Sequence, residues 1–289
     1  MTLKRSRRRT SLATGLIVAA LLLPSCGAGP AAPSPTLDPG STPTGLNLTA
    51  EPTIIYLGHC GYAVWTGRRL LIFDYTEYYE QPPASRAFAQ GYVNATEMKD
   101  LDVTVFVTHD HIDHNSPVIQ GWQNVVTNIK YVYGWAAGAR TGHYSISQPR
   151  GTLNLNGVEI STVFDHHDTG AEVAFLVSAD GLVIFHGGDY QGIAAPGAPI
   201  TAAEDMRYLA TRAGRPDLFF IGAWVGEANL QMIAGLNPKV IFPMHYGGQE
   251  SRYLQFATDL RAQGVTQPVT CPARRGDRYI YRNGQIVGP

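Results

Sequence analysis

The sequence places three histidines and two aspartates within six consecutive positions, directly after an alternating apolar run. Residues 102–108 read DVTVFVT, and residues 109–114 read HDHIDH. Alternating β-branched residues predict a buried strand, so His109 is expected at the carboxyl end of that strand. The whole chain has only 9 histidines. Three of them at one strand end indicate a chemical role for this end.

The residue types in this cluster are those that bind borderline transition metals. Imidazoles and carboxylates together suit zinc, iron or manganese, in contrast to the all-oxygen sites of calcium and magnesium. His109 and His111 are two residues apart and point the same way if the strand end is extended. Asp113 and His114 follow at the turn and can serve a different position. Such a local cluster offers at most four ligands at awkward angles, so a full site needs residues from elsewhere.

Further ligand-type residues follow strand-like segments later in the chain. They are His166 and His167 after VEISTVFD, Asp189 after LVIFHGG, and His245 after KVIFPM. Loops at one rim of a sheet hold the sites of α/β folds, so these side chains are expected to converge on the first cluster. The glycine pairs Gly187-Gly188 and Gly247-Gly248 fit close approach of the backbone to a bound group.

The regular part of the chain begins at about residue 52. Strands are predicted over 53–57, 62–65, 70–73, 102–108, 158–164, 172–189, 217–222 and 239–243, with hairpin turns at Ala179-Asp180-Gly181 and Asn283-Gly284. Helices are predicted to begin at Ser116-Pro117, to run from a capping box at Thr201 to Gly214, and to cover 229–236 and 251–264. This order suits one layered α/β domain over residues 52–289, with sheets in the middle and helices outside.

The first 51 residues have the composition of an export signal and a linker. Residues 1–25 combine a basic start with an apolar stretch too short to span a membrane. The sequence LPSC ending at Cys26 resembles the lipobox of bacterial lipoproteins, in which the cysteine is lipidated. Residues 26–51 are rich in Pro, Gly and Ser, typical of a flexible tether. We therefore expect an extracytoplasmic protein anchored to the cell membrane through Cys26; a secreted or periplasmic protein with a plain signal peptide is the alternative.

Charge and cysteine content narrow the expected partners. A formal net charge of −1 over 289 residues gives no electrostatic footprint for nucleic acid. A small-molecule substrate is therefore the expected partner, while the oligomeric state is not indicated. Cys60 and Cys271 could pair in an oxidising compartment or remain separate buried thiols.

The motifs together resemble the metallo-β-lactamase family. THDHIDH matches the family's HxHxDH signature, and the later histidine, GGD and PMHY elements follow in the family's order. YLGHCGYAV and LIFDYTEYYEQPP are similar to the opening of its broad metal-dependent hydrolase branch, which includes ascorbate-phosphate lactonase-like proteins. The resemblance covers almost everything from residue 52 onward. It implies an αββα sandwich: two β-sheets with helices on their outer faces.

The resemblance also implies a ligand set for two metal ions, with zinc expected and iron or manganese as alternatives. One ion would be held by His109, His111 and a third-motif histidine, and the second by Asp113, His114 and His245, with Asp189 bridging. Asp74 would support the ligand loop without binding metal. For the third-motif histidine, His167 is favoured over His166 because Asp-Thr-Gly follows it. Some relatives lack this histidine, so a single ion is also open.

Several other residues are candidates for the pocket around these ligands. His59 either lies near the pocket, as in this branch, or is a satisfied partly buried side chain. His186 is expected to support ligands or to belong to the core, and His143 to lie on the surface. The segment DYTEYYE either overhangs the site or covers the edge of the fold. Trp224 and Tyr246 follow strands that end at the rim and are expected to line the pocket, more so than Trp135.

These features predict an exported hydrolase that cleaves an ester, lactone, amide or phosphoester with metal-activated water. The sequence has no Gly-x-Ser-x-Gly elbow that would supply a serine nucleophile. Asp113 is expected to orient the attacking group or to protonate the leaving atom. The alternatives are a non-catalytic metal-binding or sensing lipoprotein on the same fold and a di-iron redox enzyme. The absence of a flavodoxin-like segment after His245 counts against the redox enzyme.

Overall fold

The computed structural model describes residues 46, 48–166, 172–193 and 201–288. These residues fall within one unit of the chain, residues 43–289. The expected signal peptide 1–25, the lipidation site Cys26 and most of the tether 26–51 lie outside the described residues, as does His167. The predictions for these segments stay predictions.

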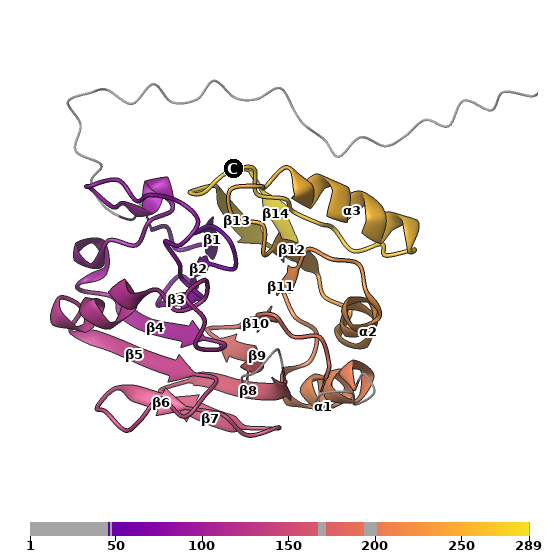
Figure 1. Ribbon diagram of the computed structural model, residues 1–289, viewed down its shortest axis with the longest axis horizontal. Coiled ribbons are helices and arrows are strands. Elements are labelled where there is room, and N and C mark those ends of the chain that lie inside the picture. The colour runs from indigo at the N-terminus through magenta and orange to yellow at the C-terminus, as the bar shows by residue number, and fades with distance from the viewer. Residues whose placement is uncertain (1–45, 47, 167–171, 194–200, 289) are drawn as a thin grey trace, which may run out of the picture. The chain divides into compact units, whose positions relative to one another are not determined.

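Two β-sheets form the described domain (Figure 1). The first contains β1 (Thr53–Tyr56), β2 (Tyr62–Trp65), β3 (Leu70–Phe73), β4 (Asp102–Val107), β5 (Asn128–Tyr133), β6 (His143–Ser145), β13 (Arg278–Arg282) and β14 (Gln285–Val287). The second contains β7 (Thr152–Leu155), β8 (Val158–Asp165), β9 (Glu172–Ala179), β10 (Leu182–His186), β11 (Leu218–Gly222) and β12 (Val240–Met244). Their orders are β14-β13-β1-β2-β3-β4-β5-β6 and β12-β11-β10-β9-β8-β7.

Strand direction brings the predicted ligands to one edge of each sheet. In the first sheet, β3 and β4 are parallel neighbours. In the second, β10, β11 and β12 are parallel, and β8 shares their direction because β8 and β10 are both antiparallel to β9. Parallel strands end at the same edge of a sheet. The segments after β3, β4, β8, β10 and β12 carry Asp74, His109, His166, Asp189 and His245.

The main hydrophobic core unites side chains of both sheets. Tyr62 of the first sheet stacks on Phe220 of the second at 4.3 Å between ring centroids, and Phe106 meets Phe175 edge to face at 5.4 Å. All four rings are fully buried. Burying one such side chain contributes about 1.5–3 kcal/mol. The resulting apolar layer holds the two sheets, and with them the two halves of the ligand set, in fixed relation.

Helices cover the outer faces of both sheets. The α-helices are α1 (Ala202–Ala213), α2 (Glu227–Leu236) and α3 (Arg252–Ala262). α1 packs on β8 and β9, α2 packs on α1, and α3 packs on β12. Buried side chains of 3₁₀ helices Phe88–Gln90, Ala95–Met98 and Pro117–Asn124 cover the first sheet. The αββα sandwich is therefore confirmed. None of the helices described is both long and apolar enough to cross a membrane.

Local expectations were met at the turns and partly at the helix starts. Asp180 and Gly181, and likewise Asn283 and Gly284, adopt the positive φ of tight hairpins. The helix after Ser116 begins at Pro117 but is a 3₁₀ helix, and Ser116 makes no side-chain capping bond. The prediction of a capping box at Thr201 was wrong. The Thr201 hydroxyl donates to the Gly192 carbonyl and to Asp205, and it does not cap the helix.

A buried ion pair joins the turns of the two sheets. Asp180, in the β9–β10 turn, accepts hydrogen bonds from Arg69 Nε at 2.8 Å and from Thr66 Oγ1 at 2.6 Å. The Arg69 and Asp180 side chains are only 10% and 7% exposed. Arg69 Nη1 also donates to the Asn156 carbonyl at 3.1 Å. This pair therefore ties the β2–β3 turn to the second sheet.

We predict that Asp180→Asn lowers the free energy of unfolding by about 2–3 kcal/mol, because the Arg69 guanidinium loses its buried carboxylate. Asparagine keeps the residue's shape and tolerates the positive φ at this turn. Urea unfolding of the variant measures the change. The control, Asp100→Asn, removes an exposed carboxylate and should cost less than about 0.5 kcal/mol. Equal effects of the two variants would show that the ion pair does not stabilise the sandwich.

Candidate metal centre

Asp189 lies between three of the predicted histidines. Its Oδ1 atom is 2.9 Å from His245 Nε2 and 3.2 Å from His114 Nε2, and its Oδ2 atom is 3.8 Å from His109 Nε2. Burial raises the pKa of Asp189, but the charges of His114 and His245 outweigh this effect and hold the pKa far below its usual value. An ionised carboxylate that faces histidines on two sides is the arrangement that a group bridging two metal positions requires.

His109 and His111 meet on one side of this carboxylate. His109 Nε2 lies 3.0 Å from His111 Nδ1. Two nitrogens on one tetrahedral zinc are separated by about 3.3 Å, so this spacing suits a shared ion. Burial, together with the nearby His114, lowers the pKa of His109 to about 3. Its imidazole is therefore neutral, as a metal ligand must be.

Asp74 fixes the orientation of His114. The Asp74 side chain is fully buried, and it accepts hydrogen bonds from the backbone N–H and the hydroxyl of Thr108 at 2.8 and 2.7 Å. Its Oδ2 atom also lies 2.9 Å from His114 Nδ1. Burial raises the pKa of Asp74, but the charges of His186 and His114 outweigh this effect and hold the pKa below its usual value. With Nδ1 held in this way, Nε2 of His114 faces Asp189.

Two supporting residues were missed from the sequence. Thr108 ends the strand before His109 and anchors Asp74. Glu172, the first residue of β9, is buried with Oε2 3.3 Å from His109 Nδ1. Burial, with the charges of Asp189 and Asp165, raises the pKa of Glu172 well above its usual value. The available signal was a charged residue at the start of an otherwise apolar strand.

Backbone strain gathers at this site. Among the described residues, seven other than glycine have positive φ. Four of them are Asn or Asp residues outside the site, at turns or at a helix end, where this conformation is tolerated: Asn156, Asp180, Asn237 and Asn283. The others are His59, Asp74 and His245, with φ of 50°, 43° and 83°. Each such residue costs on the order of 1–3 kcal/mol, and strain of this kind clusters at functional sites.

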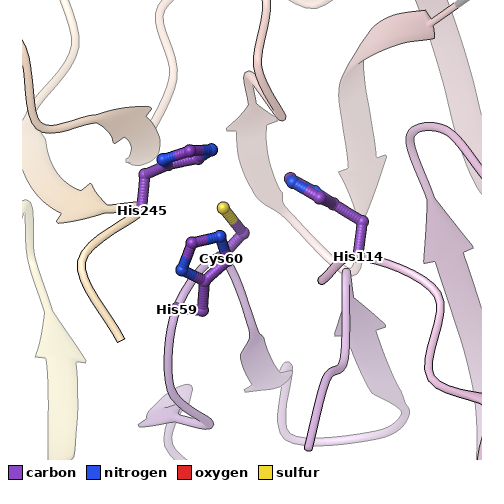
Figure 2. Close-up of side chains that lie close together, drawn as sticks. All are labelled: His59, Cys60, His114 and His245. Carbon is purple, nitrogen blue, oxygen red and sulfur yellow. The ribbon is translucent and has the colours of Figure 1, made fainter. Parts of the chain in front are cut away.

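His59 lies against the ligand cluster. Its ring is 4.5 Å from the His245 ring and 5.7 Å from the His114 ring, measured between centroids. His59, Cys60, His114 and His245 each offer a ligand atom within 4.8 Å of one another (Figure 2). His59 therefore lies beside two of the ligand candidates. His186 is fully buried, with Nε2 2.9 Å from the Cys60 carbonyl oxygen and its ring stacked on Phe73.

The segment after β3 reaches over the site. The Tyr79 hydroxyl donates to Asp113 Oδ2 at 3.1 Å, and the Tyr79 ring lies 4.4 Å from the His59 ring. Asp113 Oδ2 is also 3.5 Å from His59 Nε2. Burial raises the pKa of Asp113, but the contact with His59 and the charge of His114 outweigh this effect and hold the pKa well below its usual value. Asp113 is therefore ionised in the metal-free protein and accepts hydrogen bonds, so it is better suited to orient a group than to protonate one.

A cavity of about 280 Å³ opens beside the cluster, lined by Asp189, Gln191, Trp224 and His245. The Trp224 ring meets His245 edge to face at 5.1 Å. Tyr246 is not among the described residues that line this cavity; its ring lies under the Arg252 guanidinium at 4.8 Å and contacts the Tyr253 ring.

A separate groove of about 310 Å³ contains Trp135, Arg140 and His143 among its lining residues. His143 is half-buried and stacks on Tyr131 at 4.5 Å, so it is not an isolated surface residue. Trp135 therefore lines this groove and not the cavity beside His245.

The remaining candidates have separate outcomes. His167 lies outside the described residues, so the choice between His166 and His167 stays a prediction. His166 is half-buried, and its backbone N–H donates to the Ile193 carbonyl at 2.7 Å. Cys60 and Cys271 are separate thiols, and Cys271 Sγ donates to the Tyr253 carbonyl at 3.2 Å.

The glycine pairs serve close packing within the protein. A Cβ at Gly188 would lie 2.7 Å from the Thr108 side chain, and one at Gly247 would lie 3.1 Å from His59. The approach expected toward a bound group is therefore an approach to Thr108 and His59.

The donor set fits a metal ion. The Nε2 atoms of His59, His114 and His245 are buried and make no hydrogen bond of acceptable geometry within the described part of the chain. Buried polar atoms are nearly always hydrogen-bonded, so this convergence calls for a further partner. Imidazoles and carboxylates suit zinc, iron or manganese as that partner.

We predict that Asp74→Asn weakens metal binding about 10–100-fold, because an amide cannot accept hydrogen bonds from Thr108 and His114 together. Competition with a chromogenic chelator measures the affinity. The control, Asp217→Asn, changes a buried carboxylate that binds Lys239 and Val183 outside the cluster and should leave affinity unchanged. Wild-type affinity in Asp74→Asn would contradict the orienting role.

Structures of low sequence identity share this fold. One is Igni18, a metallo hydrolase from the archaeon Ignicoccus hospitalis, with a TM-score of 0.58, 18% identity, and coverage of 80% of this chain and 98% of that chain. Another is the metallo-β-lactamase fold protein YhfI from Bacillus subtilis, with a TM-score of 0.51, 15% identity, and coverage of 80% and 100%. A variant of CmlA, a diiron β-hydroxylase from Streptomyces venezuelae, has a TM-score of 0.51, 13% identity, and coverage of 81% and 54%.

Sequence comparison identifies the family. No curated protein sequence matches the chain significantly. The model of the beta-lactamase superfamily domain, however, matches residues 53–245, about two thirds of the chain. This range begins at β1 and ends at His245, so it includes every described ligand candidate. The chain therefore belongs to the beta-lactamase superfamily.

Proposed function

We propose that this protein is a metal-dependent hydrolase of small molecules. The observation that carries the proposal is the position of Asp189, whose two oxygens face His245 and His114 on one side and His109 on the other. Two zinc ions held by these residues would supply Lewis-acid chemistry and an activated water. The description of Igni18 as a metallo hydrolase supports the reaction class.

The chain's own residues would prepare the site for hydrolysis. Asp74 Oδ2 lies 2.9 Å from Nδ1 of His114, and the Thr108 hydroxyl lies 3.0 Å from Nδ1 of His109. These contacts leave the Nε2 atoms for metal. Asp113, ionised and free of a lysine or arginine partner among the described residues, would accept a hydrogen bond from the attacking water and so orient it.

The surroundings favour a small substrate. The cavity of about 280 Å³ lies at the lower end of the volumes of small-molecule sites, about 300–1,000 Å³. Trp224 supplies an apolar wall beside His245. An ester, lactone, amide or phosphoester of modest size would fit these features, and the fold itself does not choose among them.

Metal analysis with a substrate screen tests the proposal. The full chain, loaded with zinc, is expected to bind two ions and to hydrolyse at least one of a lactone, a phosphodiester and a β-lactam. His109→Ala should lower kcat/KM at least about 100-fold by removing a ligand, and Asp113→Asn should lower it about 10–100-fold while keeping the metal. His143→Ala, in the separate groove, is the control and should be near wild type.

The other readings predict different results. Two ions without turnover that depends on His109 would favour a metal-binding or sensing protein. Iron with a visible absorption band would favour a redox enzyme, the class to which CmlA belongs. Absence of metal after loading would overturn the proposed function.

We also propose that the protein is exported and held on the membrane by a lipid on Cys26. The basic start, the short apolar stretch and LPSC support this proposal. Cys26→Ser should move the protein from the membrane fraction to the soluble fraction, whereas Cys271→Ser should not. Unchanged fractionation of Cys26→Ser would contradict lipidation and favour the secreted or periplasmic alternative.

A further inference from the structure

The loop between β1 and β2 brings a sulfur atom to the metal centre. Cys60 follows His59 in this loop and is fully buried. In Figure 2 its thiol points into the space between the His114 and His245 rings, with the His59 ring beside it. The ligand atoms of these four residues all lie within 4.8 Å of one another.

The backbone that carries the thiol is held by contacts within and beside the loop. The Cys60 carbonyl oxygen lies 2.9 Å from His186 Nε2, and the loop is closed by a hydrogen bond from the Gly61 N–H to the Gly58 carbonyl at 2.7 Å. Gly58, at φ of 85°, and His59, at φ of 50°, adopt the left-handed conformation that this tight loop needs. The fold therefore holds the backbone of Cys60 in place before any ligand binds.

Asp113 does not converge with these atoms. The resemblance to the family implied that Asp113 would bind the same ion as His114 and His245. Asp113 belongs to neither of the two groups of converging ligand atoms found among the described residues. Its Oδ2 atom instead accepts from Tyr79 and lies 3.5 Å from His59. Apart from the shared Asp189, the ion between His114 and His245 would then lack an anionic ligand.

We propose that Cys60, as a thiolate, is the anionic ligand of the metal position between His114 and His245, and that this position selects zinc. The proposal rests on the metal centre of the proposed function. Tetrahedral zinc separates its nitrogen and sulfur ligands by about 3.3–3.6 Å, so the observed cluster needs to contract by only about an ångström. On binding, the sulfur forms a bond to the ion and its proton passes to solvent.

Sulfur in the ligand set narrows the choice of metal. Thiolate with imidazole favours zinc, whereas manganese and magnesium prefer carboxylate, carbonyl and water oxygens. The position between His114 and His245 should therefore hold zinc in preference to manganese. The position beside His109 and His111, which Cys60 does not join, should discriminate less.

X-ray absorption at the zinc edge tests the proposal on the full, zinc-loaded chain. Wild type should show a sulfur neighbour at about 2.3 Å beside nitrogen and oxygen at about 2.0–2.1 Å. Cys60→Ser should lose the sulfur signal and bind the second zinc at least about 100-fold more weakly, beyond the 10–100-fold effect of residues that only support ligands. Cys271→Ser and Asp113→Asn should keep the sulfur signal.

Cobalt provides a second readout that needs no turnover. The cobalt-loaded wild type should show a sulfur-to-cobalt charge-transfer band, which Cys60→Ser and Cys60→Ala lose and Cys271→Ser retains. If the Cys60 variants do not fold, as judged by circular dichroism, the wild-type spectra decide. Two bound ions with only nitrogen and oxygen neighbours would overturn the sulfur ligand and leave the hydrolase proposal standing. Absence of metal would overturn both.

Discussion

The buried carboxylate of Asp74 is the contact on which the metal centre depends. It accepts hydrogen bonds from the backbone N–H and the hydroxyl of Thr108 and lies 2.9 Å from Nδ1 of His114, and all three residues are fully buried. These bonds tie the end of β3 to the end of β4 and set the direction of the histidine. Because an ionised carboxylate is costly to bury without partners, the arrangement is stable only with all of these donors present.

Several energetically unfavourable features lie close to that contact. His59, Asp74 and His245 have strained backbones, and three histidine nitrogens are buried without a well-formed hydrogen bond to any described residue. Proteins retain such features where the surrounding structure is rigid enough to impose them and where function requires them. Here the aromatic layer between the sheets and the Arg69–Asp180 pair supply that rigidity. A metal ion would satisfy the histidine nitrogens, which links binding to stability.

Local patterns in the sequence predicted much of the architecture. Short β-rich apolar runs indicated β4, β8 and β12, and Asp-Gly and Asn-Gly pairs indicated two hairpins, because these signals depend on neighbouring residues alone. The short strands β5, β6 and β7 were not predicted. β6 and β7 have 3 and 4 residues, and the side chains of β5 are exposed to half-buried over its first half, so no strong pattern marks them.

The sequence by itself determined the kind of chemistry, since HDHIDH and the later His and Asp residues at strand ends carry ligand types that suit a metal site wherever they meet. Only the tertiary structure decided which side chains converge. Glu172, Thr108 and Cys60 join the centre because strands far apart in the chain place them there, and Asp113 turns instead to Tyr79 and His59. The reason is physical: residue type is local information, whereas the separation of two ligand atoms depends on the register and packing of both sheets.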